Sequence, residues 1–392
     1  MGDAATVLVA GAGPVGLSAA LSLAQAGIEV RVADIAADVD KRMRASTFHP
    51  PTLDMIGDLG LADELIAQGL KVPTFQLRQH ETGEHVTFDL GVIGDATAHP
   101  YRLQVEQHHY CQFAIAALAE FGVEVEFGCG VVSVSQDSAA ATVRSSAGDI
   151  RASCLIAADC ATSTVRKSLG LDYGGKTYTH SSVLISTPFP FHEHLDELDG
   201  VNYCWSERGP FSLLRLKSFW RASLYPGVED LDAAAEEERV REWLAYIHPD
   251  AHDAKILNSN PYRVHERCVD RFRVGRVLLA GDAAHLNPPS GGMGMNGGIH
   301  DAMNLSDKLR EVLDGADDSL LDRYDRQRRT LASQRIIPQA SANRERMATM
   351  DKALQLERLE KYRSISADAK ANREFLLRSS MITGLREAEY IE

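Results

Sequence analysis

The chain has 392 residues, of which 44% are apolar and 24% are charged, so it is long enough for two domains and is typical of a soluble globular protein. Its formal net charge of −14 at pH 7 argues against a nucleic-acid partner, because binding a polyanion needs a basic surface that no Lys/Arg run supplies. It has no basic N-terminal region and no stretch near the ~20 apolar residues that cross a bilayer, so we expect a cytoplasmic protein without a membrane partner.

The first elements predict a βαβ unit. Thr6–Ala10 is a short run of apolar and β-branched residues, Leu17–Ala26 repeats Leu and Ala at helical spacing, and Glu29–Ala33 alternates as a second strand. The first strand and the helix are joined by a short glycine-rich turn, which indicates a nucleotide site.

That turn carries a dinucleotide fingerprint, Gly-Ala-Gly-Pro-Val-Gly, from Gly11 to Gly16. Gly11 permits the tight turn, Gly13 lets a phosphate approach the backbone, and Gly16 lets the helix pack on the strand. Pro14 opens the helix, whose free N–H groups would face the pyrophosphate. Asp34 ends the second strand, where an acid can bind a ribose diol. We assign all five residues to cofactor binding.

Three later strands would extend this parallel sheet: Val123–Phe127, Cys154–Ala158 and Val277–Ala280. They are far apart in the chain, so the sheet is assembled discontinuously. We therefore expect an α/β fold with a Rossmann-like domain.

An insertion lies between the last two of these strands. Residues 176–270 are rich in aromatic side chains and alternate in polarity, as in Phe211–Arg215 and Trp220–Tyr225. This pattern predicts the antiparallel strands of an inserted substrate domain.

The chain becomes helical in pattern beyond Asp301. Arg323–Arg335 and Asn343–Arg363 are heavily charged, with apolar residues at helical spacing, and Pro338 should break or kink the helix between them. We interpret these charges as solvated helix faces.

The segment Arg276–Leu305 is the most informative part of the chain, because its strand ends in Gly281-Asp282. A strand that ends in Gly-Asp, found together with the glycine fingerprint at residues 11–16, indicates that the dinucleotide is FAD. Asp282 is acceptor-only when ionised, so it suits a ribityl hydroxyl donor.

The loop after this strand is rich in glycine and proline. The glycines within residues 291–294 allow the backbone to lie flat against an isoalloxazine ring. A helix starting near Asn296 would point its positive end at flavin N1 and O2 and stabilise the anionic reduced flavin. Pro288 and Pro289 would stiffen the loop beside the ring.

With these motifs, the chain resembles a group A FAD-dependent aromatic hydroxylase of the 4-hydroxybenzoate hydroxylase type, discontinuously from about Val7 to Arg329. Two further matches are Arg42-Met43-Arg44-Ala45, a family segment that contacts the pyrophosphate, and Gln107, where the family places a glutamine at the flavin. The resemblance also assigns these residues to the cofactor: Gly281, Asp282, Gly294, Met295 and Asn296. It places the Pro288-Pro289 loop near the site of oxygen attack.

One motif is altered. Ala158–Arg166 resembles the family's Asp-Gly motif, which implies that Asp159 binds FAD and NAD(P)H, but Cys160 occupies the glycine position. We interpret Cys160 as a tolerated small side chain rather than as a covalent attachment point for the flavin. No second GxGxxG follows a strand, which fits group A hydroxylases and counts against reductases with two dinucleotide domains.

We divide the chain into an FAD-binding domain, a substrate domain and a C-terminal helical region. The FAD-binding domain takes residues 1–71, 101–175 and 270–318, the substrate domain takes 72–100 and 176–269, and the helical region takes 319–392. The resemblance implies a substrate pocket on the inserted sheet, with Tyr203, Arg215 and Tyr225 as candidates. Arg215 could equally be a solvent-facing strand residue.

The resemblance implies a single-component monooxygenase. NAD(P)H reduces FAD, O2 adds at C4a, and the resulting hydroperoxide delivers an OH group to an activated phenol-like or heteroaromatic ring. The expected partners are a small aromatic substrate, O2 and a second copy of the chain in a homodimer. Two alternatives stay open: an FAD oxidoreductase or epoxidase acting on a non-aromatic substrate, and a non-catalytic FAD- or ligand-binding protein.

Metal chemistry is not expected. The six cysteines have no CxxC spacing, and the histidines of His108-His109 and His192-Glu193-His194 fit no zinc pattern. His285, just after the Gly-Asp-Ala-Ala motif, is expected to support the loop rather than to transfer protons.

Overall fold

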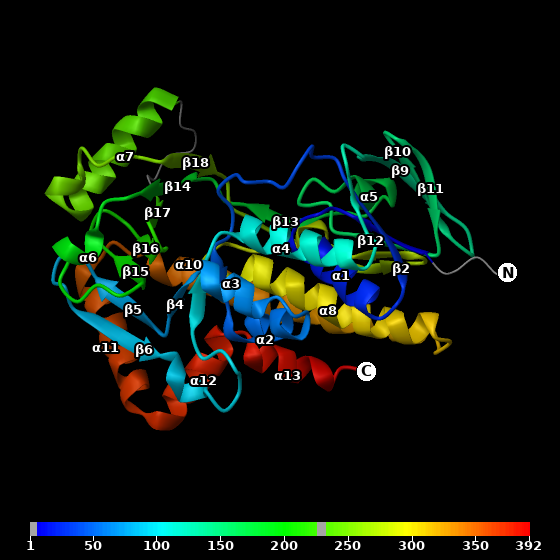
Figure 1. The fold of residues 1–392 in the computed structure, drawn as a ribbon. Coiled ribbons are helices and arrows are strands. Elements are labelled where there is room, and N and C mark those ends of the chain that lie inside the picture. Colours follow the sequence, from blue (N-terminus) through cyan, green and yellow to red (C-terminus); the bar gives the residue numbers. More distant parts are fainter. Residues whose placement is uncertain (1–5, 226–232) are drawn as a thin grey trace.

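The computed structural model describes residues 6–225 and 233–392, and Figure 1 shows them as an α/β fold built around two main sheets. A six-stranded sheet lies on one side of the molecule with α1, α4 and α8, and a seven-stranded sheet lies on the other. Helices from the end of the chain run along both. The predicted fold class, a Rossmann-like sheet with an inserted antiparallel sheet and a helical C-terminus, is confirmed.

The six-stranded sheet has the order β20-β21-β12-β1-β2-β8, and all neighbours are parallel except β20 and β21. Its central strands are almost wholly apolar because both faces are covered. The predicted strands are all present, and β20 is an addition. The bounds are β1 (Thr6–Ala10), β2 (Glu29–Asp34), β8 (Val125–Phe127), β12 (Cys154–Ala157), β20 (Arg273–Val274) and β21 (Val277–Leu279).

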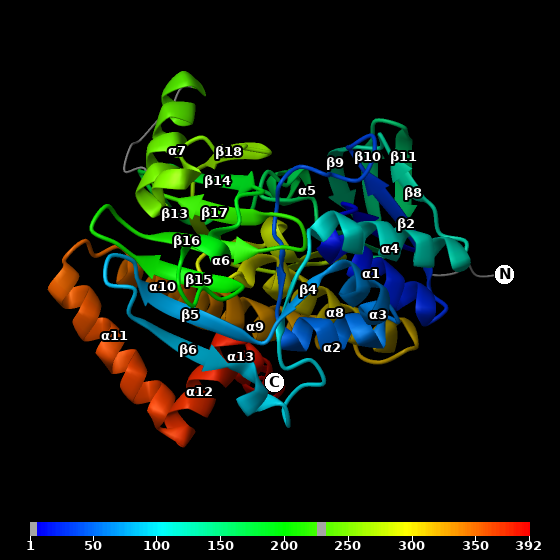
Figure 2. The ribbon, with the colours of Figure 1, turned by 60° about the vertical axis from the view of Figure 1, so that its left-hand side comes forward.

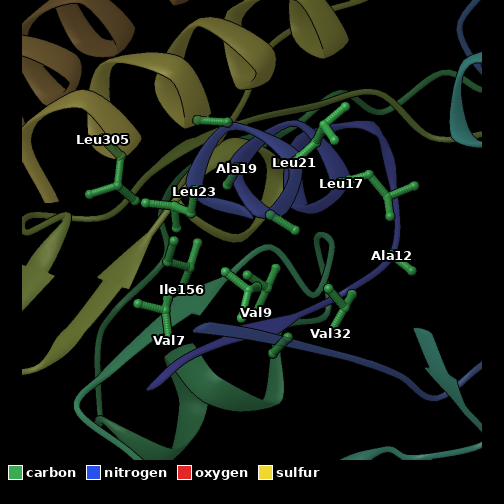
Figure 3. Close-up of a cluster of buried hydrophobic side chains, with 14 of the residues drawn as sticks. Val7, Val9, Ala12, Leu17, Ala19, Leu21, Leu23, Val32, Ile156 and Leu305 are labelled. Atoms are coloured by element: carbon green, nitrogen blue, oxygen red, sulfur yellow. The ribbon is translucent and has the colours of Figure 1, made fainter. Parts of the chain in front are cut away.

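Helix α1 (Pro14–Gln25) lies between this sheet and α8 (Met293–Leu313). In Figure 3, Val9 and Ile156 of the sheet lie on one side of α1 and Leu305 of α8 on another, and all three side chains are fully buried. This packing fixes the turn before α1 at the carboxyl edge of the sheet, beside the start of α8.

The seven-stranded sheet has the order β18-β14-β17-β16-β15-β5-β6 and is antiparallel apart from the β5–β15 pair. One face packs against α7, and the other packs against α11 and α12. The bounds are β5 (Thr74–Gln79), β6 (His85–Asp89), β14 (Ser182–Thr187), β15 (Val201–Trp205), β16 (Phe211–Arg215), β17 (Trp220–Leu224) and β18 (Asn258–Tyr262).

Strand pairing therefore joins residues 74–89 and 182–262 in one sheet. The division into domains stays a prediction: β19 of the insertion pairs with β22 outside it and with β13, which spans the boundary at residue 176. The smaller sheets are β3-β7-β4, β11-β10-β9 and β13-β19-β22. Their bounds are β3 (Thr47–Phe48), β4 (Leu70–Val72), β7 (Arg102–Gln104), β9 (Val131–Gln136), β10 (Ala141–Ser145), β11 (Gly148–Ala152), β13 (Gly174–Thr177), β19 (His265–Cys268) and β22 (His285–Leu286).

The helices of the first three quarters of the chain mostly cover the sheets. In addition to α1 and α8, they are α2 (Pro50–Asp58), α3 (Ala62–Gln68), η1 (Leu90–Ile93), α4 (Gln107–Glu120), α5 (Thr164–Ser168), α6 (Phe191–His194), α7 (Ala233–Ile247), η2 (Pro249–Ala251) and η3 (Gly281–Ala283). Within residues 6–225 and 233–392, no helix has the length and apolar character needed to cross a bilayer.

The C-terminal region is helical, as predicted, but its helices are not interrupted at the predicted position, Pro338. A π-helical turn, η4 (Ala332–Ile336), directly precedes the helix that holds Pro338 in its first turn, where proline is tolerated. The segment from Asn343 to Arg363 does not form one helix. Asp351 caps a new helix, because its side chain accepts a hydrogen bond from the backbone N–H of Leu354. The bounds are α9 (Ser319–Leu331), α10 (Ile337–Met347), α11 (Lys352–Ala367), α12 (Ala369–Ser379) and α13 (Ile382–Glu389).

Asp301 of α8 is a fully buried carboxylate that joins three other segments. One oxygen accepts from Nε of Arg328 in α9 at 2.6 Å, and the other accepts from the N–H of Gly281 at 3.0 Å and from Nε2 of His285 at 2.7 Å. Burial by itself would raise the pKa of Asp301, but Arg328 and His285 lower it to about 2. The carboxylate therefore stays ionised and fixes the turn after β21 against α8 and α9.

Replacing Asp301 with Ala should lower the free energy of unfolding by about 3–5 kcal/mol, because the buried guanidinium of Arg328 loses its ion-pair partner. Denaturant unfolding measures the loss. The matched control is Asp149→Ala, since Asp149 is exposed and 3.9 Å from Arg144, and such pairs contribute less than about 1 kcal/mol. Equal effects of the two substitutions would contradict the prediction.

The same interaction predicts a pH dependence. A carboxyl whose pKa is lowered by folding stabilises the protein fully above its ordinary value of 3.8, and this contribution is lost as the pH falls toward about 2. The difference in stability between wild type and Asp301→Asn should shrink over that window.

Candidate active site

A cavity of about 1880 Å³ extends from the carboxyl ends of β1 and β2 to the seven-stranded sheet and to α10–α12. The ends of parallel strands are where open α/β sheets bind ligands. Many predicted site residues line it: Gly11, Gly13, Pro14, Asp34, Arg42, Arg44, Gln107, Asp159, Tyr203, Tyr225, Asp282, Pro289, Gly294 and Met295. Others lie behind its wall: Gly16, Arg215, Gly281, Pro288 and Asn296.

Each glycine of the fingerprint is required for a different geometric reason. Gly11 has a φ of +111°, and a Cβ there would lie 2.3 Å from the carbonyl oxygen of Ala158. A Cβ on Gly16 would lie 1.9 Å from the carbonyl oxygen of Gly11, so Gly16 permits close packing inside the turn. A Cβ on Gly13 would meet nothing within 4 Å, so the backbone there borders open space that a phosphate could approach.

Asp34 holds two turns together at the end of β2. One carboxylate oxygen accepts from the N–H of Ala12 at 2.6 Å, and the other accepts from the N–H of Ala36 at 2.7 Å. Because an ionised carboxylate offers about four acceptor sites, capacity remains for ribose hydroxyls.

Asp40 organises the two predicted arginines, and our sequence reasoning missed it. Nε and Nη2 of Arg42 each donate to Asp40 at 2.8 Å, and Nη2 of Arg44 donates at 3.2 Å. The hydrogen bond from Arg42 lowers the pKa of Asp40 to about 2. The acid two residues before the Arg-x-Arg sequence was the available signal.

Cys160 adopts a φ of +64°, in the left-handed region that favours glycine. The resemblance expects glycine here, and the backbone angle gives the physical reason. Cys160 is exposed at the cavity, yet desolvation by the surrounding protein and the nearby charge of Asp282 raise the pKa of its thiol to about 11, so the thiol is protonated at neutral pH and is a poor nucleophile. Beside it, Oδ2 of Asp159 accepts from the N–H of Val165 at 3.1 Å, whereas Oδ1 is buried without a partner among the described residues.

Asp282 opens into the cavity from the turn η3. The surrounding protein raises the pKa of its carboxyl by desolvation. The hydroxyl of Tyr173 donates to the backbone carbonyl of Asp282 at 2.7 Å. The preceding residue, Gly281, has a φ of +58°, and the side chain of Val15 occupies the space that a Cβ on Gly281 would need. Gly281 therefore shapes the turn, while Asp282 presents its carboxylate to the cavity.

Asn296 braces the start of α8 and does not face the cavity, which corrects its assignment to the cofactor. Its Nδ2 donates to the carbonyl oxygens of Thr47 at 2.9 Å and Gly292 at 2.6 Å, and its Oδ1 accepts from the N–H of His49 at 2.9 Å. The helix also starts earlier than predicted, at Met293. The expected loop residue Pro288 is likewise buried behind the cavity wall.

Arg215 does not line the cavity, which corrects its choice as a substrate residue. Side chains alternate along β16, so Leu214 faces the cavity and Leu213 faces α7. Arg215 shares the face of Leu213 and lies opposite Trp220, which packs with the α7 cluster. The other interpretation of Arg215, a solvent-facing strand residue, stays a prediction, because the residue is half-buried on that face.

Arg221 is a buried arginine that lines the cavity, and the sequence did not single it out. Its Nη2 donates to Oε1 of Glu106 at 2.6 Å, and its Nη1 donates to the carbonyl oxygen of Arg44 at 2.6 Å. Burial lowers the pKa of Arg221, but the ion pair with Glu106 opposes this. Arg221 thereby ties the cavity segment 42–44 to the start of α4, where Gln107 lies.

Tyr203 and Tyr225 line the cavity from the seven-stranded sheet. The hydroxyl of Tyr203 accepts from Nη1 of Arg102 at 3.1 Å, and the Arg102 guanidinium lies 4.2 Å from the ring centre of Phe75. Tyr225 hydrogen-bonds Ser290, and burial raises the pKa of the Tyr225 phenol. Both phenols are therefore held in place by hydrogen bonds, and the raised pKa of Tyr225 keeps that phenol neutral.

The histidines lie elsewhere. His285 belongs to the Asp301 network, as the expected loop-supporting role requires. Two groups bring potential metal ligands within 4.8 Å of one another: Glu106 with His108 and His109, and His194 with His248 and Asp250. The second group joins α6 to η2, so sequence spacing could not reveal it. The absence of a metal stays a prediction.

Cys160→Gly should raise the free energy of unfolding by about 1 kcal/mol, because glycine removes a left-handed strain of about 1–3 kcal/mol but gains unfolded-state entropy. Thermal unfolding of the protein measures the gain. Cys160→Ser is the control, since serine keeps a Cβ and should bring no such gain. A stabilisation by serine equal to that by glycine would point to the thiol rather than to the backbone.

The chain is similar to known flavin-dependent proteins. The FAD binding domain family model matches residues 4–337. Para-nitrophenol 4-monooxygenase of Pseudomonas sp. strain WBC-3 is 33% identical over 393 residues, which cover 98% of this chain and 97% of that protein. The 6-hydroxy-3-succinoylpyridine 3-monooxygenase of Pseudomonas putida strain S16 is 31% identical over 354 residues, with 86% and 87% covered.

A solved structure extends the similarity to three dimensions. The crystal structure of p-nitrophenol 4-monooxygenase from Pseudomonas putida DLL-E4 superposes with a TM-score of 0.90 at 31% identity, covering 96% of this chain and 98% of that one. The family match and the relatives cover most of the chain. The chain therefore belongs to the FAD binding domain family and is an FAD-dependent aromatic monooxygenase of the 4-hydroxybenzoate hydroxylase type.

Proposed function

We propose that this enzyme hydroxylates an activated aromatic ring, either phenol-like or a hydroxylated heteroaromatic, with NAD(P)H as reductant and O2 as the source of oxygen. One observation carries the proposal. A single cavity is lined both by the FAD-fingerprint residues Gly13 and Asp34 and by Tyr203 and Tyr225 of the seven-stranded sheet. A cofactor and a small ring bound there would share one space, as a direct transfer of oxygen requires.

The residues present fit FAD. Gly13 leaves room for the pyrophosphate, and the arginines of segment 42–44 would neutralise it. Asp34 would hold the adenosine ribose and Asp282 the ribityl chain. The unpartnered Oδ1 of Asp159 would accept a further hydrogen bond from the cofactor.

When bound and reduced by NAD(P)H, FAD supplies the activation of O2 and the oxygen transfer. The start of α8 would stabilise negative charge on the cofactor. Gly292 at the N-cap provides no side-chain cap, so the first N–H groups of the helix are free to face the cavity. Asn296 keeps this helix end in position through its bonds to Thr47 and Gly292.

The sheet side would orient the substrate and exclude water. Phe75, Leu77 and Leu214 give the cavity an apolar wall, and Pro289 lies on the loop after β22. The phenols of Tyr203 and Tyr225, fixed by Arg102 and Ser290, would bind the ring oxygen that activates the substrate.

The relatives support an aromatic substrate. The two named above act on para-nitrophenol and on 6-hydroxy-3-succinoylpyridine, and both compounds are hydroxylated aromatic rings. The homodimer stays a prediction, which sedimentation analysis would decide.

Asp282→Ala should reduce FAD retention more than Asp34→Ala. Asp282 presents its carboxylate to the cavity, where desolvation raises its pKa, and loss of a hydrogen bond to a charged group costs about 1.5–3 kcal/mol, or roughly tenfold or more in affinity. Flavin titration of the stripped protein measures both. An equal or larger loss in Asp34→Ala would reverse the assignment of the two carboxylates.

NAD(P)H oxidation by the FAD-loaded enzyme should be slow alone and should accelerate strongly when a suitable phenol is added, because gating avoids wasteful release of peroxide. With isotopically labelled O2, mass spectrometry should find one labelled oxygen in the product. Stimulated oxidation that never labels a phenolic product would favour the oxidoreductase or epoxidase alternative. No oxidation by FAD-loaded protein with any phenol would favour the non-catalytic alternative.

A further inference from the structure

Two histidines and one aspartate meet on the side of the seven-stranded sheet that packs against α7. His194 is the last residue of the short helix α6, His248 directly follows α7, and Asp250 lies in η2. One atom from each side chain lies within 4.8 Å of the other two. None of the three residues lines the cavity, so the proposed hydroxylation does not use them.

The distances between these side chains are close to those of a tetrahedral metal site. Oδ2 of Asp250 is 3.5 Å from Nδ1 of His194 and 3.8 Å from Nδ1 of His248. Bonds of about 2.0–2.2 Å to a tetrahedral zinc ion would place two ligand atoms roughly 3.3–3.5 Å apart. Small rotations of the side chains would therefore bring all three atoms to one ion.

The packing beneath the two rings holds them near each other. The ring centre of Phe189 lies 4.5 Å from that of His194, in a stacked arrangement, and 6.2 Å from that of His248. Phe191 and Ala251 are fully buried in the apolar cluster that joins α7 to β14 and β17. Both ligand segments are therefore anchored in the core, and a site on a fixed scaffold costs little reorganisation when the ion binds.

The three side chains have few competing partners. In the part of the chain that the structure describes, neither the His194 ring nor the Asp250 carboxylate forms a hydrogen bond. Nδ1 of His248 accepts from the N–H of Asp250 at 3.3 Å, a long hydrogen bond that a metal ion would replace. The side chain of Asp250 is 68% exposed, so an ion can enter from solvent and keep a water ligand.

The other group of potential ligands, Glu106 with His108 and His109, is a poorer candidate. Oε1 of Glu106 accepts from the buried guanidinium of Arg221 at 2.6 Å. The negative charge of that carboxylate is already neutralised, and the arginine would repel a metal cation. No cationic side chain pairs with Asp250 apart from the two histidines, which bind metals in their neutral form.

We propose that His194, His248 and Asp250 bind a zinc ion, which joins the loop before β15 to the end of α7. Two imidazoles and one carboxylate suit Zn²⁺, whereas Mg²⁺ prefers oxygen ligands alone. Water would complete the coordination. Sequence spacing predicts no metal here, because the ligands come from two separate segments that only the fold brings together.

The site is remote from the flavin end of the cavity. Figure 2 shows α7 beside β14 and β17 and well away from α1, which follows the glycine fingerprint. Bound zinc should therefore stabilise the inserted sheet and α7 without changing the amount of FAD that the protein retains.

The test titrates Zn²⁺ into untagged, FAD-loaded protein in competition with a chromophoric chelator. We expect one Zn²⁺ per chain. The Tm should rise by about 3 °C when free Zn²⁺ is about a hundredfold above its dissociation constant, because an ion that binds only the folded chain stabilises it. Mg²⁺ at the same concentration should produce no such rise.

His194→Gln and Asp250→Asn should each weaken zinc binding about tenfold or more, since loss of a group that merely supports a zinc ligand can cost that much. His252→Gln is the matched control. His252 lies two residues beyond Asp250, is exposed and hydrogen-bonds Asp253 at 2.7 Å, so its loss should leave zinc binding unchanged. FAD content and the Tm without zinc, both equal to wild type, show that each variant is folded.

Absence of saturable zinc binding would overturn the inference, as would equal binding by wild type and His194→Gln. His109→Gln decides between the two groups of potential ligands. If this substitution removes the zinc and His194→Gln does not, the ion lies beside Glu106 and the inference is wrong.

Discussion

The buried ion pair between Asp301 and Arg328 is the interaction on which the cofactor end of the cavity depends. A charge taken out of water needs good partners, and each partner of Asp301 comes from a different segment. One of them is the N–H of Gly281, the residue before Asp282. The position of the Asp282 carboxylate relative to the start of α8 is therefore set by a network that lies behind the cavity wall.

A second constraint is the distance between backbone turns at the carboxyl edge of the sheet. Parallel pairing of β1 and β12 brings the turn at Gly11 against Ala158, so closely that no side chain fits. The next residues, Asp159 and Cys160, then reach the same cavity as Asp34. Cys160 has a left-handed backbone, so the altered motif has the conformation that favours glycine although a cysteine occupies the position.

Electrostatics divides the cavity into two environments. Among the described lining residues, the carboxylates lie at the end formed by β1, β2 and η3, whereas the charged residues at the end of the seven-stranded sheet and α10–α12 are basic. Arg221 connects the two ends, since it pairs with Glu106 and holds the backbone of Arg44. The buried position of this ion pair makes its geometry rigid, and a rigid frame suits a reaction that depends on the distance between two bound groups.

The sequence by itself determined the Rossmann-like sheet, the FAD motifs and the inserted strands, because glycine turns and apolar periodicity are local signals. Tertiary structure alone decided which side of each strand faces the cavity. The register of β16 and β17 places Arg215 opposite Trp220 and Arg221 opposite Leu214, so the cavity receives Arg221 and not the predicted Arg215. The contribution of α10–α12 was equally invisible, since helical periodicity identifies an amphipathic helix but not the surface that it covers.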